Sequence, residues 1–200
     1  MKKLISLILA TMLICSILPA YTEETTVSVL VVVFSHAGEN WQVGIIDEGN
    51  TMKMAKIIAN KMNADLFEID PVIPYPMEYE AVKTVAQTEL DEDARPEYQG
   101  DVVDWARYET VFVGYPIWWG GMPKIVVHFL EDHDFAGKTV IPFNTHGGSG
   151  QGGTQSVIEH MLMGATVLQG LAVTGTQAQN DPEKTEQDVE VWLKIIGLAE

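Results

Sequence analysis

Hydroxyl, amide and glycine residues are concentrated in the segment 35–52, which reads Ser-His-Ala-Gly-Glu-Asn-Trp-Gln-Val-Gly-Ile-Ile-Asp-Glu-Gly-Asn-Thr-Met. It follows the apolar run 27–34 and leads into a stretch with apolar residues at helical spacing. Backbone N–H groups converge where a strand passes through such a loop into a helix, and the helix dipole favours negative charge there. The segment therefore predicts an anion site, suited to a ligand that carries phosphate.

The composition of this loop argues for a single phosphate group. Gly44 and Gly49 have the spacing of a nucleotide-binding P-loop, but Asn50 stands where that motif has its lysine. Without the lysine, and with Asp47 and Glu48 in the loop, a triphosphate with Mg²⁺ would be poorly held. A phosphomonoester needs only hydroxyl and N–H donors, and the candidates are Ser35, Asn50 and Thr51. The alternative is a long turn before a helix for which Asn50 is simply the N-cap.

Two adjacent tryptophans occur in a second loop, 115–121, directly after another apolar run. Trp118 and Trp119 would be costly if merely exposed, and they are suited to stacking on a flat aromatic ring. Gly120 and Gly121 would let the backbone approach such a ring closely. The alternative is that both indoles cover a helix of their own domain.

A third, glycine-rich loop, 144–153, follows the fourth predicted strand. Its part 148–153 matches the dinucleotide-binding pattern G-x-G-x-x-G, but that motif belongs after the first strand and needs an acid about 20 residues later. Neither condition is met here. We interpret the loop as a wall rich in N–H groups, with an ordinary loop before a helix as the alternative.

Alternating strands and helices are needed to position these loops. Short apolar segments predict strands at 27–34, 65–69, 111–114, 139–143 and 165–168. Helices are predicted from Asn50, over 78–94, from Pro123, over 156–161 and over 183–196. This order predicts an α/β fold, a doubly wound three-layer sandwich around a parallel sheet. Ligands of such sheets bind outside the carboxyl ends of the strands, where all three loops are expected.

Together, the three loops resemble those of the flavodoxin family, over about residues 27–197. They are most similar to the bacterial flavodoxin-like subgroup with a long first loop. The matching segments are Phe34-Ser35 with Gly38-Glu-Asn-Trp41 and Gly49-Asn-Thr51, then Gly114-Tyr-Pro-Ile-Trp-Trp-Gly120, then Thr145-His-Gly-Gly-Ser-Gly150. The resemblance implies a five-stranded sheet of order 2-1-3-4-5 and non-covalently bound FMN. Against the family's short T-x-T-G-x-T phosphate loop, residues 39–48 are an insertion.

The resemblance also implies where FMN would be held. The phosphate would lie on Ser35, Asn50 and Thr51, and the isoalloxazine between 116–120 and 145–150. The expected cofactor contacts are Ser35, His36, Asn50, Thr51, Pro116, Ile117, Trp118, Trp119, Gly120, Thr145, His146, Gly147, Gly148, Ser149 and Gly150. We assign no catalytic residue and no metal ligand.

Electron transfer is the function that these features favour, with a basic redox protein as partner. A flavin would carry the redox chemistry and the protein would tune it. The alternative is an FMN-dependent oxidoreductase that uses NAD(P)H or a quinone, with His146 or Tyr115 hydrogen-bonded to substrate or flavin. A third reading is a flavodoxin fold without flavin, against which the intact hydroxyl, tryptophan and glycine sets argue.

Composition and the N-terminus set the remaining bounds. A chain of 200 residues is one domain by length, and its formal charge of −16 argues against binding to nucleic acid or to an anionic membrane. Lys2 and Lys3 precede an apolar run that ends near Ala20, which predicts a signal peptide over 1–20 and an exported protein. An uncleaved N-terminal membrane anchor is the alternative. Cys15 is the only cysteine, so cleavage would leave a domain without a thiol.

Overall fold

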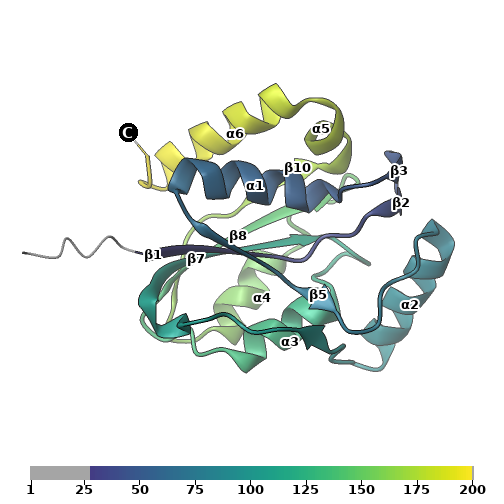
Figure 1. Cartoon of the computed structure of the whole chain (residues 1–200), viewed down its shortest axis with the longest axis horizontal. Coiled ribbons are helices and arrows are strands. Elements are labelled where there is room, and N and C mark those ends of the chain that lie inside the picture. Colours follow the sequence, from purple (N-terminus) through teal and green to yellow (C-terminus); the bar gives the residue numbers. More distant parts are fainter. Residues whose placement is uncertain (1–27, 200) are drawn as a thin grey trace, which may run out of the picture.

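A parallel sheet forms the centre of the computed structural model, which describes residues 28–199 (Figure 1). Its main strands are β1 (Ser28–Val33), β4 (Asp65–Glu68), β7 (Tyr108–Pro116), β8 (Thr139–His146) and β10 (Leu171–Thr174). They lie in the order β10-β8-β7-β1-β4, and every pair is parallel. Numbered by their succession along the chain, this is the predicted order 2-1-3-4-5, which is confirmed. The predicted signal peptide lies outside the described residues.

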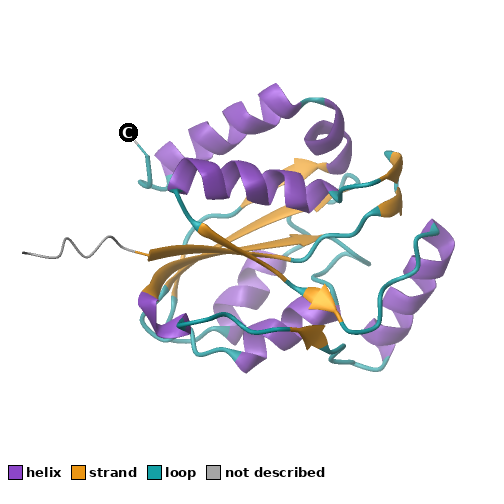
Figure 2. Cartoon of the chain, viewed as in Figure 1, coloured by secondary structure: helices purple, strands orange, loops and turns teal. Residues whose placement is uncertain are grey.

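Helices cover both faces of the sheet (Figure 2). One face carries α1 (Asn50–Met62), α5 (Gly175–Asn180) and α6 (Pro182–Ile195). The other carries α2 (Tyr79–Asp91), α3 (Lys124–Asp132) and α4 (Thr154–Met161). Along β1, Leu30 and Val32 pack into the core on the α3 side, while Val31 and Val33 pack into the core under α1. A strand that is buried on both faces is apolar throughout, and the doubly wound three-layer sandwich is confirmed.

Two small antiparallel pairs and a short helix complete the fold. β2 (Gly38–Asn40) pairs with β3 (Gly44–Ile46), and β5 (Asp70–Pro71) pairs with β6 (Tyr98–Gln99). A 3-10 helix, η1 (Trp105–Arg107), precedes β7. The insertion at 39–48 is therefore mostly a hairpin, which the sequence pattern did not reveal.

The prediction of the last strand at 165–168 is wrong in its position. Only β9 (Thr166–Val167) forms there, and it pairs with Thr139 and Val140 at the start of β8. The fifth strand is β10, which pairs with 143–146 at the carboxyl end of β8. Both short runs are apolar, so their pattern does not tell which one extends the sheet toward the ligand side. Among residues 28–199 no helix is long and apolar enough to cross a membrane.

Candidate functional site

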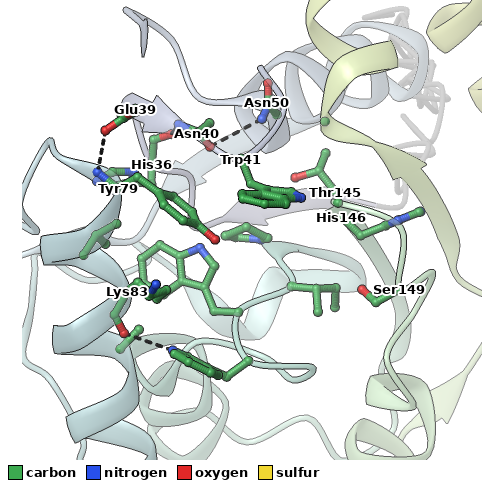
Figure 3. A pocket seen from close by; sticks show the side chains of 18 residues that line it. His36, Glu39, Asn40, Trp41, Asn50, Tyr79, Lys83, Thr145, His146 and Ser149 are labelled. Carbon is green, nitrogen blue, oxygen red and sulfur yellow. Dashed lines mark hydrogen bonds between the residues drawn. The ribbon is translucent and has the colours of Figure 1, made fainter. Parts of the chain in front are cut away.

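A cavity of about 330 Å³ lies beyond the carboxyl ends of β1, β7 and β8 (Figure 3). All three loops singled out in the sequence contribute to its lining. The predicted contacts that line it are His36, Asn50, Pro116, Ile117, Trp118, Trp119, Thr145, His146, Gly147 and Ser149. The fold thus brings residues separated by more than a hundred positions to one site, at the place expected for ligands of doubly wound sheets.

Five predicted contacts do not line this cavity, namely Ser35, Thr51, Gly120, Gly148 and Gly150. The Ser35 hydroxyl oxygen accepts a hydrogen bond from the Met52 backbone N–H, at 3.0 Å. Thr51 is buried, and its hydroxyl is 2.7 Å from that of Thr145. Thr51 thus supports a lining residue of the cavity, whereas Ser35 lines a second pocket with Gly49 and Met52. Whether either residue contacts a bound phosphate stays a prediction.

Helix α1 begins at Asn50, as the sequence predicts, but a different residue is its N-cap. Gly49 is the N-cap, in an extended conformation, and Asn50 is the first helical residue. Asn50 is therefore not the cap. The Ser35 oxygen takes over part of that function, because it accepts a first-turn N–H group from a distance of 17 residues. The N–H groups of Asn50 and Thr51 have no carbonyl acceptor within the helix, which leaves them suited to an anion.

The Asn50 side chain is buried but only partly hydrogen-bonded. Its Nδ2 donates to the Asn40 side-chain oxygen at 3.4 Å, a long bond. Within the described part of the chain, its Oδ1 has no hydrogen-bond partner. A buried amide oxygen without a partner is rare and costs free energy, so this oxygen is open to a hydrogen bond from water or from a ligand.

The two adjacent tryptophans have different environments. Trp118 packs edge-on against Phe34 and Tyr75, with ring centroids 5.3 and 5.1 Å apart. Trp119 is 51% exposed, and its indole N–H donates to the Lys83 carbonyl. Trp119 therefore covers part of α2, as the alternative expects, but half of its surface stays exposed and it lines the cavity.

Trp119 also has an unfavourable backbone conformation. Trp118 and Gly121 exchange two backbone hydrogen bonds across a two-residue turn in which Trp119 has φ 49° and Gly120 φ 79°. Positive φ at both central positions defines a type I′ turn, which favours asparagine and glycine. A bulky residue there costs about 1–3 kcal/mol, and such strain is typical of functional sites.

His146, in the third loop, is held in one neutral tautomer. The Gly148 backbone N–H donates to His146 Nδ1 at 2.9 Å, so the ring proton of the neutral imidazole is on Nε2. Burial lowers the pKa of His146, which favours this neutral form. Tyr115 is unavailable to a ligand, because it is buried and its hydroxyl donates to Thr154 Oγ1. The suggested role of Tyr115 in binding flavin or substrate is wrong.

Positive charge is scarce around the cavity. His36 Nε2 lies 2.9 Å from the Pro76 carbonyl, and burial lowers the pKa of His36 despite this hydrogen bond. Among the lining residues of the described chain, Lys83 alone is a permanent cation, and it pairs with Glu80. A bound phosphate would therefore be held by N–H and hydroxyl groups, as the composition of the first loop predicts.

Sequence reasoning missed several lining residues, which are Glu39, Asn40, Trp41, Tyr79, Val82, Lys83, Ala86 and Gly175. The positions 79, 82, 83 and 86 form one stripe of α2 at helical spacing, which could have revealed a helix face turned toward other residues. The pattern does not say what that face meets. The residues 39–41 belong to the hairpin, for which no local signal was identified.

The fold and the cavity define a flavodoxin-like α/β protein with a ligand site at the strand ends. A sequence model described as flavodoxin matches residues 44–193. The chain belongs to the flavodoxin family.

Solved structures agree with this assignment. A provisionally assigned flavoprotein from Bacteroides eggerthii DSM 20697 is 28% identical with a TM-score of 0.68, over 84% of this chain and 97% of its own. A second, from Bacteroides uniformis ATCC 8492, is 28% identical with a TM-score of 0.64 and the same coverage. A flavoprotein in complex with FMN from Lactobacillus acidophilus NCFM, 20% identical with a TM-score of 0.59, covers 72% of this chain and 92% of its own and shares the fold. Among curated proteins, none matches the chain.

Proposed function

We propose that this protein binds FMN in the cavity and acts in electron transfer. The observation that carries the proposal is the pairing of two features in one cavity. One is the first turn of α1, whose first N–H groups have no carbonyl acceptor within the helix, together with the Asn50 oxygen, which has no partner among the described residues. The other is the set of aromatic side chains beside it. Phosphate and a flat ring need these two environments at neighbouring places.

The residues fit the cofactor. The N–H groups of Asn50 and Thr51 would bind the phosphate, and the Ser35 hydroxyl can donate to it while its oxygen still accepts from Met52. The Asn50 oxygen would accept from a hydroxyl of the ligand. Trp119 and the backbone of 145–149 would flank the ring. Bound FMN would supply the redox chemistry, and the protein residues would orient it and limit its contact with water.

The charge of the protein determines whether bound FMN would have a higher or a lower reduction potential than free FMN. The formal charge of −16 opposes additional negative charge in the cavity, and both lining histidines favour their neutral forms. We therefore expect a reduction potential below that of free FMN. The same acidic surface would attract a basic redox protein. We further propose that the protein is exported, with residues 1–20 as its signal.

A titration of the purified protein with FMN tests the proposal, followed by flavin fluorescence and by the visible spectrum. Riboflavin, which lacks the phosphate, is the matched ligand. We expect FMN to bind much more tightly than riboflavin, and spectroelectrochemistry of the complex to give the lowered potential. A colourless protein that also fails to bind added FMN would exclude the proposed function.

An FMN-dependent oxidoreductase is the second candidate, and one observation favours it. The α2 residues Tyr79, Val82, Lys83 and Ala86 extend the cavity beyond the strand-end loops, which would give room for a second substrate over the ring. Steady oxidation of NADH or NADPH with a quinone would establish this activity. An electron carrier would instead show only stoichiometric reduction.

A further inference from the structure

The hairpin β2–β3 bounds the cavity on the side that the strand-end loops leave open. Trp41, directly after β2, lines the cavity, and its ring centroid is 5.6 Å from that of Tyr79 on α2. On its other side the indole approaches the third loop so closely that a Cβ atom on Gly147 would be 2.6 Å from Trp41 Cδ1. Figure 3 shows the indole between Tyr79 and Thr145. One side chain of the insertion thus connects α2 to the third loop across the cavity.

The base of the hairpin is held firmly in place. The Glu39 backbone N–H donates to the Met77 carbonyl at 2.7 Å, and the Glu39 carboxylate accepts from the Tyr79 N–H at the start of α2, at 3.0 Å. The Asn40 amide donates to the carbonyls of His36 and Gly38. These bonds fix the position from which the next residue, Trp41, extends.

Beyond this base, two large apolar side chains of the hairpin are solvent-exposed. Trp41 is 58% exposed and Ile45, on the second strand, is 84% exposed. A large indole that is more than half exposed, although it is directed into a cavity, has apolar surface left to bury. A flat ligand in the cavity would bury it.

The hairpin also contacts the opposite end of the cavity. The Asn40 side-chain oxygen accepts the long hydrogen bond from Asn50, at the start of α1. Two consecutive residues of the insertion, Asn40 and Trp41, therefore contact the predicted phosphate end and the predicted ring end. A ligand with both parts matches this spacing.

Resting on the proposed FMN binding, we propose that the hairpin is a third wall of the flavin pocket and that Trp41 packs its indole against the isoalloxazine. This assigns a purpose to the insertion at 39–48, in addition to the two loops that the family resemblance implies. The hairpin would mainly slow the dissociation of FMN, because the isoalloxazine must separate from Trp41 before FMN leaves. It makes Trp41 a cofactor-binding residue.

Gly147 offers an internal test of this arrangement. Its backbone lies outside the left-handed region, so alanine is compatible with its conformation. The nearest obstacle to a Cβ there is the Trp41 indole. Gly147→Ala should therefore displace Trp41, and it should be harmless once the indole has been removed.

The experiment measures FMN affinity and dissociation rate for the full-length protein and its variants by flavin fluorescence. We expect Trp41→Ala to weaken FMN binding by roughly tenfold, mostly through faster dissociation, and Trp41→Phe to retain most of the affinity. Ile45→Ala is the matched control, because it removes an exposed apolar side chain of the same hairpin that does not line the cavity. Gly147→Ala should weaken binding in the wild-type background but not together with Trp41→Ala.

Three results would contradict the proposed role of Trp41. Wild-type protein that binds FMN while Trp41→Ala binds it equally well would overturn the third wall and leave the proposed function intact. Tighter binding by Trp41→Ala would identify the indole as an obstacle to the flavin, and would also overturn it. Wild-type protein that binds no FMN would overturn the proposed function and the inference with it. Thermal melting of each variant shows that it is folded.

Discussion

The two ends of the parallel sheet contain similar residues. At one end these residues have partners within the chain, and at the other they surround a cavity. At the amino end, Lys138 Nζ donates to the Tyr108 and Trp105 carbonyls, at 2.6 and 3.2 Å, and lies 4.9 Å from the centre of the Trp105 ring. His133 stacks on Phe129 with ring centroids 4.1 Å apart, and its Nδ1 is 2.9 Å from the Phe129 carbonyl. The Trp105 indole N–H donates to the backbone carbonyl of Asp134. Tryptophan, histidine and lysine here find partners within the chain.

At the carboxyl end, the same kinds of residue surround a cavity. Among the described residues, the Asn50 oxygen has no partner. Trp119 is half exposed in a strained turn, and Trp41 is more than half exposed. The comparison shows that residue type alone does not mark a functional site. A buried oxygen without a partner, a tryptophan with positive φ and exposed aromatic surface distinguish the carboxyl end from the amino end.

The largest expected effect is on stability. A core residue at the amino end should contribute to the free energy of unfolding and not to FMN affinity. Phe129 is fully buried there, among Phe67, Tyr98, Trp105 and His133. Phe129→Ala should lower the free energy of unfolding by about 3–5 kcal/mol because it leaves a cavity. FMN affinity of the folded protein should not change. Urea unfolding and FMN titration test this, and Phe129→Leu should lose less than about 1.5 kcal/mol. Loss of FMN affinity in folded Phe129→Leu would contradict the division between the two ends.

Asn50→Ala should have the opposite effect, which is weaker FMN binding with little change in stability. Removal of the side-chain oxygen that would accept from a ligand hydroxyl should cost about 0.5–1.5 kcal/mol of FMN binding, while the backbone N–H groups proposed for the phosphate remain. Riboflavin, which carries the same hydroxyl groups, should lose a similar amount, and the unfolding midpoint should change little, since the side-chain hydrogen bond that is lost is a long one. Asn60→Ala, at an exposed position of the same helix, is the control. A loss for FMN alone would contradict this expectation, because it would place the Asn50 side chain at the phosphate.

Trp119→Asn should stabilise the protein while it weakens FMN binding. Asparagine suits the first central position of a type I′ turn, so relief of strain should raise the free energy of unfolding by about 0.5–1 kcal/mol. FMN affinity should fall several-fold because the indole is lost. Gly120→Ala should instead destabilise by about 1–2 kcal/mol, since alanine is strained at φ 79°. A destabilised Trp119→Asn protein would mean that Trp119 serves the fold rather than the ligand.

The smallest expected effect is a pH dependence. Burial lowers the folded-state pKa of His36 and His146 below 6.5, so the unfolded chain binds more protons as the pH falls past that value. Their contribution to stability is present above pH 6.5 and is lost as the pH falls toward the lowered pKa values. Chemical unfolding between about pH 5 and 8 measures the slope. The double variant His36→Asn, His146→Asn should show a flatter slope, and an unchanged one would contradict this assignment.

Much of the fold was predictable because its strands are buried on both faces. The run 27–34 is almost entirely apolar, and β1 indeed lies inside the sheet, between β7 and β4. The three loops were placed correctly, since the carboxyl ends of parallel strands meet at one edge. The fifth strand was misplaced because two short apolar runs, at β9 and β10, compete for the same edge of β8.

The site was predictable only in part. Trp118 and Trp119 are neighbours in the sequence, but only the structure shows that one packs inward and the other is exposed. Ser35 caps a helix that begins 15 positions later, at Asn50, a contact that no local pattern reveals. Tyr79 and Trp41 come from different elements and meet only after the chain has folded.

The sequence by itself determined the layered α/β fold and the loops that bear on phosphate and a flat ring, because periodicity and glycine or hydroxyl content are local properties of the chain. Only the tertiary structure decided which of those groups have hydrogen-bond or packing partners within the described residues and which do not. The Asn50 oxygen, the strain at Trp119 and the position of Trp41 against Gly147 depend on elements that are distant in sequence. Burial and hydrogen bonding are properties of neighbours in space, and only folding defines those neighbours.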